Sequence, residues 1–222
     1  MKRVLEPQLM EDDEQARAYA QADFEEAHNS FVERFRTIFR GRNIGPHVLD
    51  LGCGPGDISI RFARAFPEST VDGVDGSPAM LQHGEGLLEA AGGIASRVHL
   101  MRGMLPGARL PRRKYDVVIS NSLLHHLPDP QVLWNTVAEY ATRGCPVFVM
   151  DLLRPTSIEQ ANAFVEEYAA REPDVLKRDF YNSLLAAFEI DEVRDQLEKA
   201  NLAALSVEQI SDRHLIVAGS AP

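Results

Sequence analysis

The chain has 222 residues, of which 45% are hydrophobic and 25% are charged. This length and this composition are typical of one globular domain with a substantial core, or of one domain plus a small cap. The formal net charge of −10 disfavours nucleic acid as a partner, because an acidic surface repels the phosphate backbone.

The first predicted element is a helix over residues 12–40, a stretch without Pro or Gly that stops before Gly41. Four apolar residues recur at helical spacing and give it one apolar face: Phe24, Phe31, Phe35 and Ile38. The residues before it turn acidic and lack the apolar core of a signal peptide. No apolar run approaches the length needed to cross a bilayer, so we expect a cytoplasmic protein that does not bind membranes.

From residue 46 onward, strands and helices alternate. Short apolar strands are predicted at residues 47–50, 70–74, 97–101, 115–120 and 146–151. Helices are predicted between them at residues 57–65, 78–90 and 128–141, with Ser77 and Asp129 as N-caps. This alternation predicts an α/β fold, a doubly wound parallel sheet with helices on both faces.

Residues 154–188 interrupt the alternation and predict a helical insertion after the fifth strand. A helix at 191–200 and strands at 205–209 and 214–217 then close the chain. We expect residues 1–45 to form an N-terminal helical lid and residues 46–222 to form the α/β domain with its cap. The apolar faces of lid and cap should meet over a largely apolar pocket that excludes water.

A glycine-rich loop follows the first predicted strand and reads Asp50-Leu51-Gly52-Cys53-Gly54-Pro55-Gly56. Glycines at this place let the backbone approach a ligand closely. The spacing differs from the G-x-G-x-x-G of dinucleotide sites, and Asp50 would repel a pyrophosphate. The loop therefore favours a cationic cofactor over a mere tight turn, and Cys53 is interpreted as a packing residue rather than a nucleophile.

Cys53 and Cys145 are the two cysteines, and their isolation provides neither a disulfide framework nor metal-ligand spacing. The sequence accordingly predicts no metal site.

A second acid, Asp75, ends the second predicted strand, where a carboxylate can accept both hydroxyls of a ribose. Gly76 and Ser77 follow it directly, and Ser77 already supplies the helix cap. Met80 lies one turn further on, in position to cover an adenine face.

The run Ser120-Asn121-Ser122-Leu123-Leu124-His125-His126-Leu127 follows the fourth strand. Ligands of open α/β sheets lie beyond the carboxyl ends of the strands, so this run should share one crevice with the two earlier loops. Because His125 and His126 are adjacent, they should point in different directions. One is interpreted as structural, and the other as a base or as lining of the acceptor pocket.

Residues 46–151 resemble the class I S-adenosylmethionine-dependent methyltransferases. The run Ser120–Leu127 looks most like the ubiquinone/menaquinone-biosynthesis enzymes and related small-molecule methyltransferases. The resemblance implies a Rossmann-like, seven-stranded, mostly parallel sheet of order 3-2-1-4-5-7-6 with an antiparallel last hairpin. It also implies S-adenosyl-L-methionine as cofactor.

The resemblance carries roles onto particular residues. It implies that the methionine end of the cofactor is held by Asp50, Gly52, Cys53 and Gly54, with Asn121 and Ser122 beside it. It implies that Asp75, with Gly76 and Ser77, binds the ribose. The family often places an acid after the third strand, but this chain has Arg102-Gly103-Met104 there. Adenine recognition is therefore expected from the backbone at Gly103 and from packing of Met104 and Met80.

The implied activity is methyl transfer to a small-molecule acceptor, with release of S-adenosylhomocysteine. Two alternatives stay open, namely a macromolecular acceptor (protein or RNA) and a cofactor-binding regulator without turnover. An Asn-Pro-Pro-Tyr signature of amide and nucleobase methylation is absent. The catalytic candidates are His125, His126 and Tyr19; related enzymes supply a tyrosine from an N-terminal helix, and packing is the alternative role for Tyr19.

Overall fold

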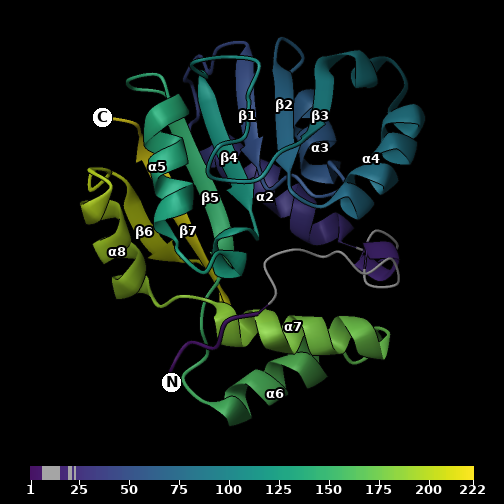
Figure 1. Ribbon diagram of the computed structural model, residues 1–222, viewed down its shortest axis with the longest axis vertical. Helices are drawn as coiled ribbons and strands as arrows, with labels where there is room; N and C mark the ends of the chain where they lie inside the picture. Colours follow the sequence, from purple (N-terminus) through teal and green to yellow (C-terminus); the bar gives the residue numbers. More distant parts are fainter. Residues whose placement is uncertain (7–15, 20–21, 23) are drawn as a thin grey trace.

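The computed structural model describes residues 1–6, 16–19, 22 and 24–222. Its centre is a seven-stranded sheet of order β3-β2-β1-β4-β5-β7-β6 (Figure 1). The first five strands pair in parallel, and β7 runs antiparallel to both β5 and β6. The doubly wound α/β fold and the strand order are both confirmed. The strands are β1 (His47–Leu51), β2 (Thr70–Asp75), β3 (Val98–Arg102), β4 (Val117–Asn121), β5 (Pro146–Leu152), β6 (Ser206–Gln209) and β7 (His214–Ser220).

Helices cover both faces of the sheet, as the alternation predicts. One face packs against α2 (Glu25–Ile38), α3 (Asp57–Ala65) and α4 (Pro78–Ala91), and the other against α5 (Gln131–Tyr140) and α8 (Ile190–Lys199). Two short 3₁₀ helices, η1 (Gly92–Arg97) and η2 (Leu124–His126), follow α4 and β4. Because both faces are covered, the central strands are almost entirely buried, and every residue of β5 is buried.

The prediction of one helix over residues 12–40 is wrong where the structure describes it. A helical turn spans residues 16–19, and α2 begins only at Glu25. The parts of this prediction that fall on residues 7–15, 20–21 and 23 lie outside the described residues. Ile38 is 43% exposed and does not belong to the buried face.

Helix α2 buries its apolar face against one face of the sheet. This face of the helix therefore does not cover the pocket as the predicted lid would. Phe31 and Phe35 are fully buried, and their rings meet Phe148 of β5 and Phe62 of α3 at 4.8 Å between centroids. Edge-to-face aromatic contacts of this kind stabilise the packing beyond the apolar area that they bury. Only the amino-terminal end of α2 reaches the region beyond the strands.

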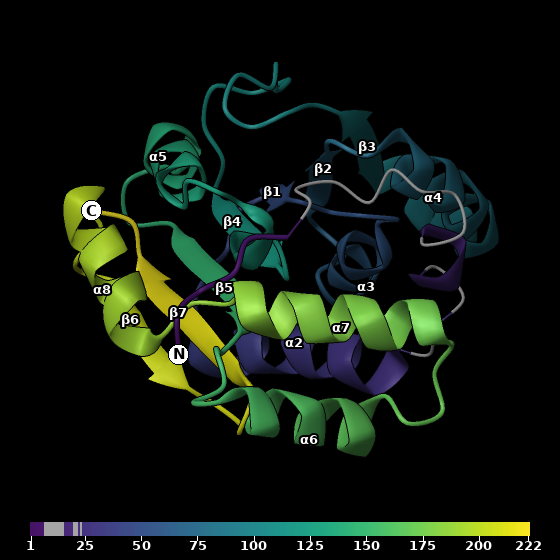
Figure 2. The same cartoon turned by 60° about the horizontal axis from the view of Figure 1, so that its bottom comes forward.

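The predicted helical insertion consists of α6 (Ile158–Tyr168) and α7 (Asp174–Ala186). The two helices lie side by side beyond one end of the sheet (Figures 1 and 2). A small apolar cluster joins them to the end of the sheet, made of Leu152 of β5, Phe164 of α6, Leu184 of α7 and Ala187 after it. Within the described part of the chain, none of the helices combines the length and the apolar character needed to cross a membrane.

Candidate functional site

A cavity of about 390 Å³ lies at the carboxyl ends of the central strands. Its wall is built from the loops after β1, β2, β3 and β4, from the start of α2, and from the α6–α7 insertion. All of the site residues that the sequence predicts line this one cavity: Tyr19, Asp50, Gly52, Cys53, Gly54, Asp75, Gly76, Ser77, Met80, Gly103, Met104, Asn121, Ser122, His125 and His126. Segments up to about a hundred residues apart thus converge as the strand topology requires.

The glycine-rich loop after β1 owes its shape to three left-handed residues. Gly52, Gly54 and Gly56 have φ values of 70°, 54° and 82°. A Cβ at Gly52 would lie 2.8 Å from Leu123, and one at Gly56 would lie 2.8 Å from Leu100. At Gly54 a Cβ would meet no atom within 4 Å. Packing within the protein therefore explains two of these glycines, whereas Gly54 borders open cavity.

Asp75 ties the loops after β1 and β2 together. Its Oδ2 accepts the N–H of Gly54 and its Oδ1 accepts the N–H of Ser77, each at 2.8 Å. Burial raises the pKa of Asp75, and the two backbone donors oppose that rise. Each carboxylate oxygen has a second lone pair, so Asp75 can still accept hydrogen bonds from a ligand in the cavity.

Asp50 ends up deep in the wall and is 1% exposed. Its Oδ2 accepts a hydrogen bond of 2.6 Å from Ser59 of α3. Burial raises the pKa of Asp50 to about 7; the Ser59 hydrogen bond opposes this rise and the nearby Asp75 adds to it. A carboxylate that is costly to ionise beside a cavity fits a cationic ligand, whose charge would offset the cost.

Asn121 is the last residue of β4 and lines the cavity. Its Oδ1 is buried and has no hydrogen-bond partner among the described residues. Ser122 follows in the left-handed region at φ 55°, with its N–H donated to Met150 at 2.9 Å. An orphaned acceptor at a cavity wall indicates that a donor from a ligand completes it.

The far side of the cavity carries two methionines. Met80 is buried in α4, and Met104 is 44% exposed. Gly103 donates its N–H to the carbonyl of Asp75 at 2.9 Å, and a Cβ there would lie 2.8 Å from Ala108. Gly103 is thus explained by packing, and the flexible Met side chains offer an apolar surface to a flat ring.

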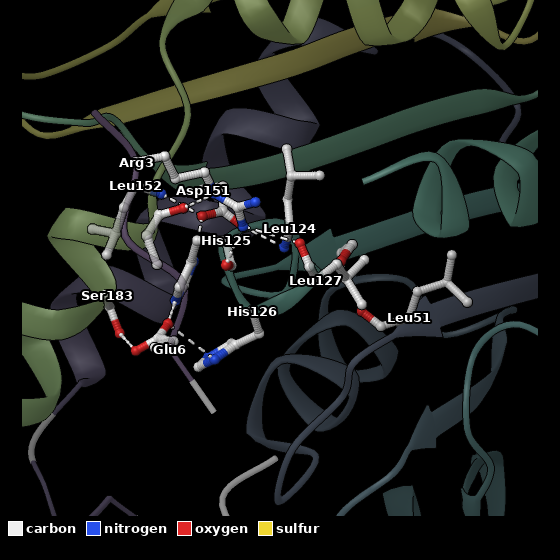
Figure 3. A network of polar contacts seen from close by, with 12 residues as sticks. Arg3, Glu6, Leu51, Leu124, His125, His126, Leu127, Asp151, Leu152 and Ser183 are labelled. Atoms are coloured by element: carbon white, nitrogen blue, oxygen red, sulfur yellow. Dashed lines mark hydrogen bonds and ion pairs between the residues drawn. The ribbon is translucent and has the colours of Figure 1, made fainter. Parts of the chain in front are cut away.

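His125 and His126 have different partners, as their adjacency predicts. The His125 ring is 3% exposed, and its Nδ1 lies 2.5 Å from Oδ1 of Asp151. The Nδ1 of His126 lies 3.1 Å from Oε1 of Glu6 (Figure 3). Burial opposes charge on His125, yet its pKa is raised because the carboxylates of Asp151 and Glu6 stabilise the imidazolium.

Sequence reasoning missed Glu6 and Asp151. Asp151 is the penultimate residue of β5, which pairs with β4, so the strand topology could have placed it near His125. Glu6 reaches the histidines through residues 1–6, which run along α7, with the N–H of Val4 donated to Leu185. No sequence pattern links residue 6 to residues 125 and 126.

Tyr19 lies in the cavity wall next to Phe24, with 4.8 Å between the ring centroids. Burial, with a contribution from Asp57 and Asp75, raises the pKa of Tyr19 to about 12. Its phenol is therefore a neutral hydrogen-bond donor at physiological pH. Both predicted roles, packing and proximity to a ligand, are compatible with this position.

The remaining wall faces the insertion. Apolar surface predominates in the cavity as a whole, as predicted, and α7 contributes Leu176 and Phe180 to this wall. Charged groups interrupt it, and Arg213 is held over the ring of Tyr168 at 3.2 Å from its centroid. Burial and the neighbouring Arg213 lower the pKa of His214 to about 4, so this ring is neutral at physiological pH.

Comparison with known protein families gives a match over residues 48–144 to a family described as a methyltransferase domain. The trans-aconitate 2-methyltransferase of Klebsiella pneumoniae is 33% identical over 99 residues, which are 44% of this chain and 36% of that enzyme. The release factor glutamine methyltransferase of Gloeobacter violaceus is 42% identical over 79 residues, 35% of this chain and 26% of that protein. The matched segment spans well under half the length of these two relatives.

Solved structures share the fold at low sequence identity. A methyltransferase dependent on S-adenosylmethionine from Aquifex aeolicus has a TM-score of 0.67 at 14% identity, covering 95% of this chain and 99% of its own. The magnesium protoporphyrin IX methyltransferase of Synechocystis, solved with bound S-adenosylmethionine, has a TM-score of 0.59 at 18% identity, covering 93% and 81%.

Proposed function

This chain carries a class I S-adenosylmethionine-dependent methyltransferase domain, and we propose that it transfers the methyl group of this cofactor to a small-molecule acceptor, with release of S-adenosylhomocysteine. The observation that carries the proposal is the single cavity in which the loops after β1, β2 and β4 meet the helical insertion. When bound, the cofactor supplies a methyl group on a sulfonium, which is already strongly electrophilic.

The donor set of the cavity fits this cofactor. We assign its cationic methionine end to Asp50 and Asn121, because one is a buried carboxylate with a raised pKa and the other an orphaned acceptor. Gly52, Cys53, Gly54 and Ser122 line the same end. We assign the ribose to Asp75, Gly76 and Ser77, and the adenine to Met80, Gly103 and Met104.

The residues beyond the loops would hold the acceptor and keep water out. Tyr19 and Phe24 border the cavity from the amino-terminal side, and Leu176 and Phe180 border it from α7. Holding a nucleophile in line at about 3 Å removes most of the entropic part of the barrier, so orientation can supply a large share of the rate. Both His125 and His126 line the cavity, so the cluster that they form with Glu6 adjoins the space for the acceptor.

The size and position of the cavity support a small acceptor. The α6–α7 insertion forms part of the cavity wall and would restrict access for a macromolecular substrate. Two of the similar proteins are named for small acceptors, trans-aconitate and a porphyrin, and a third for a glutamine of a release factor. A macromolecular acceptor is therefore the alternative that the experiment must separate.

The test has two stages. Calorimetry should show binding of S-adenosylhomocysteine, and Asp75→Ala should weaken it; no binding would reject the proposal. Release of S-adenosylhomocysteine is then measured with the small-metabolite fraction and, separately, with the macromolecular fraction of a cell extract. Turnover with the first fraction supports the proposal. Turnover with the second alone, or binding without any turnover, contradicts it in favour of a macromolecular acceptor or a regulator.

A further inference from the structure

We propose that Glu6, His125 and His126 form a binding site for a divalent transition-metal ion, with zinc as the best match. The site adjoins the acceptor side of the cavity, which both histidines line. Metal binding itself does not depend on the proposed function. The role that we assign to the ion, activation of the acceptor, does rest on it.

The three ligand atoms have the spacing of a metal site. Oε1 of Glu6 lies 3.1 Å from Nδ1 of His126 and 3.6 Å from Nε2 of His125, and all three atoms lie within 4.8 Å of one another. Zinc binds imidazole nitrogen and carboxylate oxygen at about 2.0–2.2 Å, which puts two ligands of a tetrahedral site about 3.3–3.6 Å apart. Small side-chain movements would bring all three onto one ion.

Two of these atoms lack the hydrogen bonds that a plain ion-pair network would give them. Oε1 of Glu6 and Nδ1 of His126 are both buried, and neither has an aligned hydrogen-bond partner among the described residues. The two atoms are 3.1 Å apart, which is short enough for a hydrogen bond, but the angle between donor and acceptor does not allow one. A cation between them would satisfy both lone pairs, because a ligand pair points at a shared ion instead of at each other.

The surrounding groups orient the ligands as the outer shell of a metal site does. Asp151 holds Nδ1 of His125 at 2.5 Å, which turns Nε2 toward Glu6. Oδ2 of the same carboxylate accepts the N–H of Leu124 at 2.7 Å, which fixes Asp151 itself. Carboxylate–histidine–metal arrangements of this kind fix the ring orientation and make the ligand more basic.

Glu6 is also fixed in place. Oε2 accepts a hydrogen bond of 3.1 Å from Ser183 of α7, so Oε1 faces the histidines. Arg3 anchors the same segment by donating from Nη2 to the carbonyls of His125 and Leu127 at 2.8 and 2.9 Å (Figure 3). The segment that carries Glu6 is thus bound to the turn that carries both histidines.

Three protein ligands are the number found in catalytic zinc sites, where the remaining position is open to water or substrate. The ion would bind an acceptor through an oxygen or sulfur atom and lower the pKa of its O–H or S–H, whose proton passes to solvent. The lone pair of that atom then forms the bond to the methyl carbon, while the electron pair of the carbon–sulfur bond stays on the cofactor sulfur. The acceptor class is therefore a hydroxyl, carboxyl or thiol compound.

The sequence predicts no metal site because its ligands are not close along the chain. Two adjacent histidines do not form a recognisable ligand pattern, and the third ligand lies at residue 6. Only the course of residues 1–6 along α7 brings Glu6 to them.

Zinc binding to the full, metal-free chain is the test, measured by competition with a chromophoric chelator. We expect one ion per chain. Glu6→Gln and His126→Ala should each weaken binding by roughly 10-fold or more, and Asp151→Asn by roughly 10–100-fold. His83→Ala, on α4 and outside the cavity lining, is the matched control and should leave zinc affinity unchanged.

Cobalt substitution distinguishes this site from binding at Cys53, the cysteine that lines the cavity. A site made of nitrogen and oxygen should give cobalt d–d bands without a sulfur-to-cobalt charge-transfer band. Absence of zinc binding, a charge-transfer band, or unchanged affinity in both Glu6→Gln and His126→Ala would overturn the proposal. Glu6→Gln keeps the side-chain shape, and circular dichroism of both variants checks that they fold.

Binding of S-adenosylhomocysteine is measured on the same samples to keep the two proposals apart. Zinc binding without S-adenosylhomocysteine binding would leave the metal site in place and reject the methyltransferase function. The opposite result would reject the metal site alone.

Discussion

The carboxylate of Asp75 accepts the backbone N–H of Gly54 at 2.8 Å, across 21 residues of sequence. This bond joins the ends of two neighbouring parallel strands, β1 and β2, through their loops. The same carboxylate lines the cavity, so it both shapes the loop after β1 and faces the ligand that the loop would hold. A substitution at Asp75 therefore acts on the site twice.

Asp75→Ala is expected to lower the affinity for S-adenosylhomocysteine by about 1.5–3 kcal/mol, because two ribose hydroxyls lose a charged acceptor. Titration calorimetry measures the loss. Asp75→Asn is the matched control, since its amide oxygen can still accept the Gly54 or the Ser77 N–H. We expect its affinity to lie between the other two, and equal affinity in all three proteins would show that Asp75 does not contribute to cofactor binding.

Gly54→Ala is expected to abolish most cofactor binding without unfolding the protein. The added methyl group would meet no protein atom within 4 Å and would project into the cavity. Gly41→Ala is the matched control, because Gly41 also has a positive φ (78°), equally open surroundings and a place outside the cavity. Both changes should cost about 1–2 kcal/mol of stability through backbone strain.

Thermal melting with and without S-adenosylhomocysteine separates strain from binding. Both variants should melt somewhat lower than the natural protein, but only Gly54→Ala should lose the ligand-induced rise in Tm. A full ligand-induced rise in Gly54→Ala would show that the loop does not approach the ligand as proposed.

Cofactor affinity is expected to depend on the ionisation of Asp50. In the ligand-free protein burial raises the pKa of Asp50 to about 7. A cationic ligand favours the carboxylate, so binding lowers this pKa and releases a proton when the pH is below about 7. Affinity should therefore fall as the pH decreases through 7, by at most about tenfold per pH unit.

Calorimetry in buffers of different ionisation enthalpy counts the released proton. The Asp50→Asn variant should bind weakly and show no such proton release. Proton release that persists in Asp50→Asn would assign the titration to another group.

The raised pKa of Asp50 also predicts that its ionised form lowers the stability of the ligand-free protein. Its folded-state pKa is raised above the unfolded value of 3.8, so the native state holds the proton more tightly than the unfolded state. The stabilisation from this group is present at low pH and is lost as the pH rises through about 7. Asp50→Asn should therefore raise the free energy of unfolding at pH 8, by at most about 4 kcal/mol, and change it little at pH 4. Denaturant titrations at the two pH values measure this, and a larger effect at pH 4 would contradict it.

The sequence predicts the sheet well because each central strand is a short apolar run bounded by turn residues. The predicted helix at residues 57–65 agrees with α3 over its full length, and the glycine-rich loop marks its start. The break before α2 was not predicted, since Ala18 to Phe24 has good helix formers and no Pro or Gly. Tertiary packing decides there, because the Tyr19 and Phe24 rings pack together in the cavity wall.

The candidate site also contains residues that the sequence predicts and contacts that it does not predict. Loop residues such as Gly54, Asp75 and Asn121 lie at strand ends, so the strand topology brings them together without further information. The partners of His125 and His126 depend instead on side-chain direction and on the path of residues 1–6. Neither leaves a periodic signal in the sequence.

The insertion α6–α7 and the residues before α2 are expected to close over the bound cofactor, and this tests the predicted lid at residues 1–45. Both segments border the cavity, one through Phe24 and Tyr19 and the other through Leu176 and Phe180. The insertion is joined to the sheet by a small apolar cluster, so its opening should cost less free energy than opening the sheet, whose two faces carry the larger clusters. Closure would exclude water from the reacting groups.

Hydrogen exchange with and without S-adenosylhomocysteine measures this closure. Binding should slow exchange at residues 24–28 and 168–183 as well as in the loops after β1, β2 and β4. Helix α8 covers the far face of the sheet outside the cavity and is the internal control, so its exchange should not change. In Tyr168→Phe, which removes the 2.6 Å bond from Tyr168 to Asp212, exchange in α6 should speed up in the ligand-free protein. Protection that stays confined to the three loops would mean that both segments are fixed walls, and the lid would have to be abandoned.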